Sequence, residues 1–552
     1  MPSTGDSEAT SDDESVDADE EAGEYSRRNF METAAAAGAV GVTAGLAGCS
    51  GNGDGGDGGD GGDGGDGGDG GDGGDGGDGG DGGSDGTSSQ DFLWWTMRGY
   101  IPEETEALRE TAGGYEDAAD SNVNVSVEVI TWDSIFQEWE AGIQGRSLPN
   151  VSEMAGEHAV NFGYQGATQP VTELFEQYDD WYEIMTQWQA FQDEQWAVPW
   201  FIELRTSHVN MNLLDQAGIS SPPETWQDIV EQGQTINDEL DLSAAWVTPG
   251  AQDFTTGQNI SAFNYQAGSQ WYSNEDGEWG VEVDSAGTLF THLWTMSMRE
   301  QWDIAPGGWA SVDSTAGNEL YQSGEAAMAH LPTDLARGLI SPTEGVVDEY
   351  SDIAEATELT QMPAGPTGNR QSFMGGSVLA SFGEDVAQYQ AGSDLSDGFI
   401  NYMTQPAQLD EYLPVSAPNF LPVRSGQEEA ELFTNNPTEI PDSWLETRLA
   451  QAPNAVRYGI TGSGQCAPFL GSLEGSTSGY SVAISGMLGN DTDPKQALRD
   501  MGNNIRSTIN EADYVDQTLE EKTSGPNLDD APDEVQPWIE GDGVPQIWNP
   551  YE

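Results

Sequence analysis

Three short apolar segments decide the fold: DFLWWT at residues 91–96, NVSVEVI at 124–130 and NVSEM at 150–154. Segments with helical spacing of their apolar residues separate them, at 102–119 and 132–142. Strands that alternate with helices predict an α/β domain with a mainly parallel sheet. Because ligands bind at the carboxyl ends of strands in such sheets, we expect a site near the loops at 97–100 and 155–160.

The residues before this domain have the features of an export signal. Arg27 and Arg28 precede an Ala/Gly/Val-rich run at 33–48, and Leu-Ala-Gly-Cys follows at 46–49. The run is too short and too rich in glycine for a transmembrane helix. The order of these three features resembles a twin-arginine signal with a lipobox. An amphipathic surface helix is the alternative interpretation. The resemblance implies that residues 1–48 are removed and that lipid on Cys49 anchors the protein to the membrane.

Ten consecutive Asp-Gly-Gly triplets fill residues 54–83. Glycine at two positions of every three maximises chain entropy, and the aspartates keep the chain solvated. We therefore expect residues 49–90 to form a disordered tether. A flexible chain of about 40 residues has a root-mean-square reach of roughly 35 Å.

Acidic side chains dominate the composition, with 97 Asp+Glu against 16 Lys+Arg and a net charge of −81. This balance argues against nucleic-acid binding, because a phosphate backbone needs basic contacts. Neither of the two lysines, Lys495 and Lys522, follows a glycine, so the chain contains no P-loop. Residues 91–552 alone carry 75 acidic and 14 basic side chains. Such a surface suits concentrated brine, where the Debye length is about 3 Å at 1 M salt.

Aromatic residues show that the acidic body is a packed domain. The chain contains 18 Trp, 17 Tyr and 16 Phe, which suit a globular core better than a solvated disordered chain. Trp and Tyr also suit sugar binding, because each buries a large area and keeps one polar group.

Five further segments occur in a characteristic order: WAVPW (196–200) with VNMNL (209–213), LDQAGI (214–219) with PPETW (222–226), YQSGEAAM (321–328), FMGGS (373–377), and FINY (399–402) with NFLPVR (419–424). Together they resemble the extracellular solute-binding proteins of ABC importers, in particular the carbohydrate-binding group that includes maltodextrin-binding proteins. The resemblance covers most of residues 91–552. Tyr321 and Glu325 replace the phenylalanine and lysine usual in the family.

The resemblance implies an α/β, two-lobed periplasmic-binding-protein-like fold, each lobe a mainly parallel sheet flanked by helices, with the ligand cleft between the lobes. Lobe I would comprise 91–205 and 372–424, and lobe II 206–371 and 425–552. The implied function is capture of a sugar by lobe closure and delivery to a membrane permease that a separate ATPase drives. The protein would be a monomer, lipid-anchored at the extracellular face, with no cofactor or metal.

Candidate ligand contacts in lobe I lie at strand ends and at the crossing. Trp94 and Trp95 are adjacent on a strand and must face opposite sides, so at most one of them can lie in the core and the other can point at the cleft or at a covering helix. Trp95 and Arg98 form a first cluster. Glu157 and His158 form a second, although a glutamate at a helix N-terminus is also favoured by the macrodipole. Trp200 and Glu203 lie at the crossing, where Arg205 either contacts ligand or pairs with Glu203.

Candidate contacts in lobe II come from the resemblance and from local chemistry. Gln258 and Asn259 are expected in an uncharged loop before Gly268, and Thr333 and Asp334 follow a strand. The family often has a stacking aromatic where Thr333 stands. Gly375 and Gly376 permit positive φ and close backbone approach to a ligand, or form an ordinary turn.

One helix boundary can be read from local chemistry alone. Thr225 can cap the helix that begins near Trp226, with Asp228 as the carboxylate of a capping box.

Two other functions remain open from the sequence. A membrane-anchored glycoside hydrolase would use two carboxylates, but carboxylates are so abundant here that no pair stands out. A binding protein for a non-sugar solute, such as a polyol, is the other alternative. The four histidines, His158, His208, His292 and His330, show no metal-ligand spacing, which argues against zinc capture.

The charge balance predicts salt dependence. Dialysis of the full chain from molar salt to about 0.1 M salt should loosen the fold, because self-repulsion is then less screened. Circular dichroism measures the change, and an unaltered spectrum and melting temperature would contradict the brine interpretation.

Overall fold

The computed structural model describes residues 89–536, apart from gaps at 99–101, 120–121, 276–277, 341–346, 430–439, 461–464, 474–478, 490–491, 513 and 516. Arg27, Arg28 and Cys49 and the Asp-Gly-Gly triplets lie outside the described residues. The export signal, the lipid anchor and the tether therefore stay predictions.

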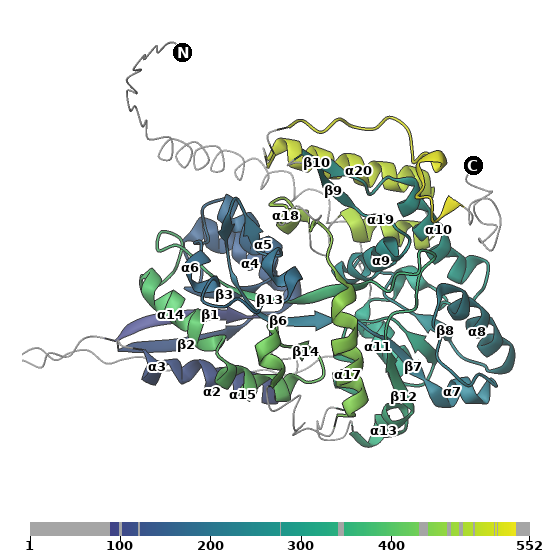
Figure 1. Ribbon diagram of the computed structural model, residues 1–552, viewed down its shortest axis with the longest axis horizontal. Coiled ribbons are helices and arrows are strands. Elements are labelled where there is room, and N and C mark those ends of the chain that lie inside the picture. Colours follow the sequence, from purple (N-terminus) through teal and green to yellow (C-terminus); the bar gives the residue numbers. More distant parts are fainter. Residues whose placement is uncertain are drawn as a thin grey trace, which may run out of the picture. The chain divides into compact units, whose positions relative to one another are not determined.

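The first lobe is built on a sheet with strand order β14-β6-β13-β3-β1-β2, and β15 also pairs with β13. Its strands are β1 (Gln90–Thr96), β2 (Val123–Val129), β3 (Val151–Met154), β6 (Val198–Leu204), β13 (Ser372–Ser381), β14 (Phe420–Leu421) and β15 (Ala455–Val456). Helices lie on both faces of the sheet (Figure 1): α2 (Pro102–Gly113), α3 (Tyr115–Ala118), α4 (Trp132–Gly145), α5 (Gly156–Tyr164), α6 (Thr172–Phe175), α14 (Ser393–Met403) and α15 (Pro406–Ser416).

Strand β1 fixes the two faces of this sheet. Trp94 packs edge-on against Trp200, at 5.5 Å between ring centroids, in the core under α2 and α14. Trp95 belongs to the second core, which α4 and α5 cover. The opposite orientation of the two tryptophans is confirmed, because successive side chains of a strand point to opposite faces. The expectation that at most one of them is a core residue is wrong, because helices cover both faces of the sheet and each tryptophan is buried in a core of its own.

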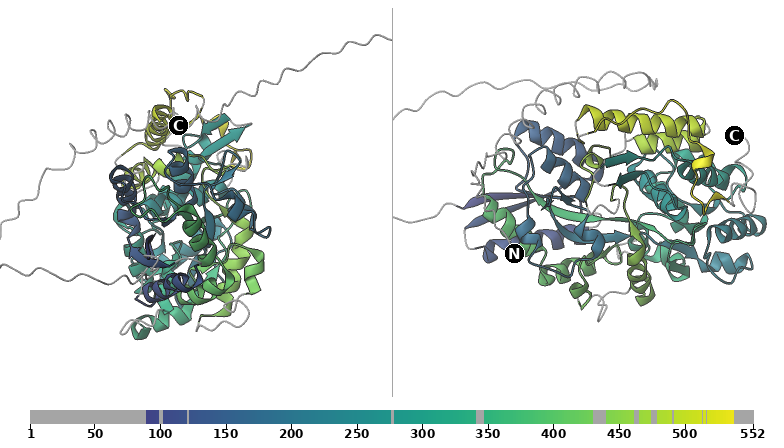
Figure 2. Two further views of the ribbon diagram at one scale, coloured as in Figure 1. Left: turned by 90° about the vertical axis from the view of Figure 1, so that its left-hand side faces the viewer. Right: turned by 45° about the horizontal axis from the view of Figure 1, so that its top comes forward.

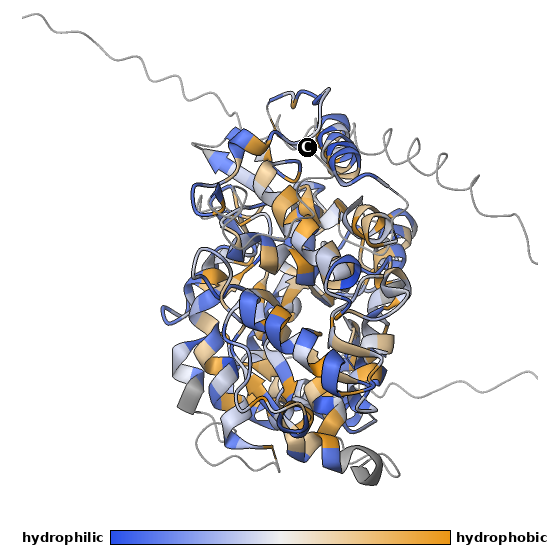
Figure 3. Cartoon of the chain, turned by 90° about the vertical axis from the view of Figure 1, so that its right-hand side faces the viewer, coloured by the Kyte–Doolittle hydropathy of each residue, from blue (hydrophilic) through white to orange (hydrophobic). Residues whose placement is uncertain are grey.

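The second lobe is built on a smaller sheet with strand order β12-β7-β11-β8. Its strands are β7 (Ser207–Asn210), β8 (Ala244–Val247), β11 (Ala326–Ala329) and β12 (Thr357–Thr360). Its helices are α7 (Met211–Gln216), α8 (Trp226–Glu239), α9 (Phe254–Gln266), α10 (Ala286–Glu300), α11 (Ser314–Gln322), α12 (Asp334–Ile340), α13 (Val347–Ala356) and α17 (Asp442–Gln451). In Figure 3 single helices carry both hydrophobic and hydrophilic residues, as helices that cover a core do.

A C-terminal group of helices completes the described chain: α18 (Leu470–Leu473), α19 (Gly479–Leu488) and α20 (Pro494–Glu511). Figure 2 shows α20 as the long yellow helix in the right-hand view. Arg506 of α20 holds the buried Asp284 at 2.9 Å, and Lys522 reaches the same carboxylate at 2.7 Å. These ion pairs tie the C-terminal residues to the second lobe.

The sheets are mixed rather than mainly parallel, which corrects one expectation. β1 is parallel to β2 and β3, and β8 is parallel to β11. The crossing strands β6 and β13 pair antiparallel with each other, and β13 also runs antiparallel to β3. Each crossing strand carries the chain from one lobe to the other, so its direction follows from the connection and not from its apolar pattern.

The capping box at the start of α8 is confirmed: the Thr225 side chain accepts from the Asp228 amide, and the Asp228 carboxylate accepts from the Thr225 amide. Replacing Asp228 by alanine should lower the free energy of unfolding by about 1 kcal/mol, because the amide loses its partner. Chemical denaturation at constant salt measures the loss. The matched variant Asp238→Ala, at an exposed position near the other end of α8, should cost nothing comparable.

All four histidines are buried, and burial lowers the pKa of His158 and of His292 to about 4, that of His330 to about 3, and that of His208 well below its usual value. In the unfolded chain these histidines have pKa values near 6.5, so protonation below that pH favours the unfolded state. Their contribution to the free energy of unfolding is fully present above pH 6.5 and decreases as the pH falls toward 4. Below pH 6.5 the slope should approach about 1.4 kcal/mol per pH unit for each histidine. Melting temperatures at pH 7.5, 6.5 and 5.5 measure it, and a flat profile would contradict the prediction.

Candidate functional site

The crossing strands bring three predicted residues together. Gly375 of β13 pairs with Glu203 of β6, and Gly376 pairs with Ile202. Gly376 has φ +124°, which side-chain-bearing residues rarely adopt. A Cβ on Gly375 would collide with the Glu203 carboxylate. The glycine pair therefore lets the Glu203 side chain lie directly over the neighbouring strand.

A polar junction extends from Glu203 into the second lobe. The Glu203 Oε1 atom accepts from the Thr333 amide at 3.2 Å and lies 3.4 Å from Arg205 Nε. Arg205 donates to the side-chain oxygens of Gln258 and Asn259, and both lie in helix α9 rather than in the expected loop. The structure thus joins five predicted or suspected residues from the end of β6, from α9 and from the residue before α12.

The pKa values of two carboxyl groups in this junction are shifted in opposite directions. Burial opposes the ionisation of Glu203, but Arg205 and the Thr333 N–H outweigh it and hold the pKa of that carboxyl below its usual value. Burial, and then the charge of Glu203, raise the pKa of Asp334. Asp334 accepts from Asn318 at 2.8 Å, and its Oδ1 atom is buried without a hydrogen bond. Asp334 therefore has a carboxylate oxygen beside the crossing that can still form a hydrogen bond.

Arg98 is fixed inside the first lobe. Its guanidinium donates to Glu153 at 2.7 Å and to Ser377 at 2.8 Å, and lies 4.4 Å from the Phe420 ring centroid. Trp95 donates its indole N–H to Glu128 at 2.9 Å. These bonds orient the first predicted cluster, but they do not bring Trp95 to the crossing.

Glu157 and His158 start α5 and are both buried. The Glu157 carboxylate receives a two-pronged contact from Arg457 and a hydrogen bond from Trp188 at 2.5 Å. The His158 ring packs between those of Phe136 and Trp139, at 5.1 and 5.4 Å. Burial is the main reason that the pKa of His158 is low, and the negative charge of Glu157 opposes it.

Phe373 on β13 lies between the polar junction around Arg205 and the Glu157–Arg457 ion pair. Arg205 lies 4.7 Å and Arg457 4.8 Å from the centroid of its ring. The two guanidinium groups therefore share one aromatic ring at the crossing, each at a cation–π distance. Trp200 is elsewhere: it stacks on Tyr412 at 5.2 Å in the core of the first lobe.

Three residues near these groups were missed by sequence reasoning. Trp132 and Phe136 are half-buried at the start of α4, where Trp132 lies 5.8 Å from Arg98. The carboxyl end of β2 was the available signal, because the rule that pointed to the loops after β1 and β3 applies there too. Arg448 of α17 is fully buried and donates to the Leu204 carbonyl at 3.0 Å. Burial lowers the pKa of Arg448 to about 10, and no local pattern marks this residue.

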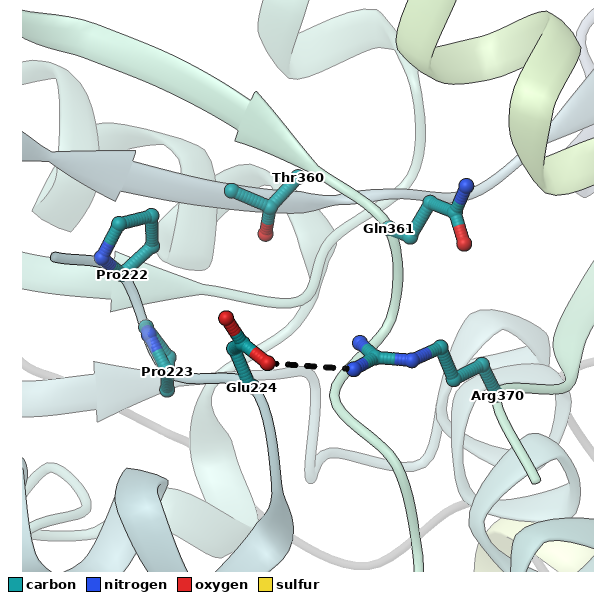
Figure 4. A pocket seen from close by; sticks show the side chains of 6 residues that line it. All are labelled: Pro222, Pro223, Glu224, Thr360, Gln361 and Arg370. Carbon is teal, nitrogen blue, oxygen red and sulfur yellow. Dashed lines mark ion pairs between the residues drawn. The ribbon is translucent and has the colours of Figure 1, made fainter. Parts of the chain in front are cut away.

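A cavity of about 400 Å³ lies away from these residues (Figure 4). Its walls come from the segment before α8 and from the end of β12, with an ion pair of 3.8 Å between Glu224 and Arg370. Its lining residues are Pro222, Pro223, Glu224, Thr360, Gln361 and Arg370. None of the predicted ligand contacts lines it, so we do not assign the site there.

Within the described ranges, no group of three or more His, Cys, Asp or Glu side chains could hold a metal ion. None of the described helices is both long and apolar enough to cross a membrane.

Known proteins with bound solutes share this fold. Maltose-bound MalE3 of T. maritima superposes with a TM-score of 0.63 at 15% identity, over 76% of this chain and 99% of that one. An ABC transporter solute-binding protein from Agrobacterium radiobacter K84 in complex with ribitol gives 0.60 at 17% identity, over 76% and 98%. These likenesses establish the two-lobed periplasmic-binding-protein fold.

Sequence comparison points the same way. The diacetylchitobiose binding protein DasA of Streptomyces coelicolor is 25% identical over 157 residues, which is 28% of this chain and 36% of that relative. The match thus spans about a third of the length of DasA. Residues 101–409, more than half of the chain, match the family described as bacterial extracellular solute-binding protein. The chain therefore belongs to the bacterial extracellular solute-binding proteins.

Proposed function

We propose that this solute-binding protein captures a sugar between its two lobes and delivers it to the permease of an ABC importer. The observation that carries the proposal is the polar junction at the crossing, where Arg205, directly after β6, contacts Gln258 and Asn259 on α9. Amide, carboxylate and guanidinium groups from both lobes are the chemistry that a rim of sugar hydroxyls requires.

Aromatic rings support the sugar class. Trp132 lies beside Arg98 and Phe136 beside His158, and both residues are half-buried. A sugar offers C–H faces as well as hydroxyls, and a half-exposed indole ring can pack against such a face. We assign Trp132 the role of the stacking ring that Thr333 cannot supply.

Closure follows from contacts to both lobes. A solute that touches residues of both lobes gains contacts in the closed state and shifts the population toward it. The crossing strands would act as hinges that absorb the backbone change. In this scheme the closed form is what the permease recognises.

The remaining features of the proposal concern cellular context. Residues 1–48 would direct twin-arginine export, lipid on Cys49 would hold the protein at the outer face of the membrane, and 49–90 would be the tether. The lobes would comprise 91–205 with 372–424 and 206–371 with 425–552, except that β15 (Ala455–Val456) pairs with β13 in the sheet of the first lobe. The monomer would work with a permease driven by a separate ATPase, in an environment of high salt.

A polyol is the second candidate solute. The structural neighbour from Agrobacterium radiobacter K84 is in complex with ribitol, so this fold accommodates a linear polyhydroxylated solute as well as a disaccharide. Both classes present hydroxyl groups to the same kinds of side chain.

A thermal-shift screen of the full chain in about 2–3 M salt tests the proposal against monosaccharides, disaccharides, oligosaccharides, polyols and non-sugars. One class should raise the melting temperature, because ligand at about 100 times Kd stabilises by about 2.7 kcal/mol. The solute should be recovered unchanged, and release of a smaller sugar would instead support a hydrolase. No shift with any sugar or polyol, on protein that is folded by circular dichroism, would contradict the proposal.

Gln258→Ala gives a variant test at the junction. It should reduce the solute-induced shift at a fixed solute concentration, because an amide of the second lobe is lost. Gln227→Ala, at an exposed position on α8, is the matched control and should retain the full shift. Equal shifts in both variants would remove Gln258 from the site.

A further inference from the structure

A short segment near the C-terminus contacts both lobes. Residues 465–473 end in α18, which lies beside α5 of the first lobe (Figure 1). Phe469 anchors the segment in the second lobe, where its ring lies 5.4 Å from Tyr272 and 5.5 Å from Trp279. The anchor is apolar and fully buried, so it fixes the segment to the second lobe by packing.

The contact with α5 is made backbone to backbone. A Cβ added to Gly471 would lie 2.8 Å from the Glu157 carbonyl oxygen and 3.1 Å from His158 Cα. Real Cβ atoms essentially never approach backbone atoms as closely as the first of these distances. Glycine is therefore required for α18 to lie this close to the first turn of α5.

Hydrogen bonds add direction to this contact. Asn161 of α5 uses its amide nitrogen twice, donating to the Pro468 carbonyl at 2.8 Å and to the Tyr514 hydroxyl at 2.9 Å. The Cys466 amide donates to the Ala190 carbonyl at 2.8 Å. The ion pair between Arg457 and Glu157 lies at the same end of α5.

We propose that residues 465–473 form a latch that holds the two lobes closed through contacts of the chain with itself. These contacts involve no solute, so they favour closure whether or not a solute is bound. The latch sets the ratio of closed to open molecules in the absence of solute. Solute binding then shifts this equilibrium further toward the closed state. The proposal depends on the lobes and not on which solute they capture.

Distance measurement between two spin labels tests the latch without any solute. The labels occupy Asp117→Cys on α3 and Glu231→Cys on α8, both at exposed positions, in the full chain carrying Cys49→Ser. Cys466 is 1% exposed and escapes labelling. We expect one main distance for the parent protein in the absence of sugars and polyols.

Gly471→Ala should add a second distance population, because its Cβ forces α18 away from α5 without changing any charge. Gly113→Ala is the matched control, since a Cβ there has nothing within 4 Å, and it should keep the parent distribution. Asn161→Ala removes the hydrogen bonds to Pro468 and Tyr514, together with one that Gln165 donates to Asn161, and should lower the ratio of closed to open molecules about tenfold. If Gly471→Ala does not fold, the Asn161→Ala variant alone tests the latch.

Two results would overturn the latch. One is a parent distribution identical to those of both latch variants, with all proteins folded by circular dichroism. The other is a parent protein that is already mostly in the long-distance population. Neither result depends on the thermal-shift screen, so failure of the latch and failure of sugar capture are distinguishable.

Discussion

Buried arginine side chains are the constraint on which the rest of this structure depends. The chain has only 16 basic residues against 97 acidic ones, yet six arginines are buried in the described part of the chain: Arg98, Arg205, Arg424, Arg448, Arg457 and Arg506. A buried charge is tolerated only when it is paired and hydrogen-bonded. Several partners are carboxylates that are buried themselves, such as Glu153, Glu157 and Asp284. The acidic excess is thus left to the surface, while the interior is close to balanced.

This arrangement explains why the lobes meet through polar groups. Arg205 and Arg457 share the ring of Phe373, and each reaches across to a different element, α9 or α5. A purely apolar interface would favour any close packing, whereas these bonds are satisfied in one arrangement only. The polar contacts at the crossing therefore favour one relative arrangement of the two lobes.

Local patterns predicted the local structure well. The opposite faces of Trp94 and Trp95, the capping box at Thr225 and the positive φ of Gly376 are confirmed, because each follows from a few neighbouring residues. The family followed from an ordered set of motifs. The expectation of mainly parallel sheets was wrong, because an apolar run has the same pattern in both strand directions. The connections between the lobes determine the direction of the crossing strands.

Long-range pairs could not be predicted in the same way. Glu157 and Arg457 are 300 residues apart, and carboxylates are too abundant for any single partner to stand out. Arg448 sits in an ordinary amphipathic helix, and only the folded chain places it under the crossing. The predicted contacts Gln258, Asn259, Glu203 and Thr333 come together through Arg205, which was left undecided between ligand and ion pair. Their role toward a solute stays a prediction.

The burial of the arginines has a consequence for the life of the protein outside the cell. Trypsin-like proteases cut only after arginine or lysine, and the bond must be presented in an exposed, flexible segment. Here such residues are scarce and six arginines are buried, although Lys522 keeps an exposed side chain beside Asp284. The same placement of positive charge that organises the crossing therefore leaves the folded domain few accessible cleavage positions for one of the commonest classes of extracellular protease.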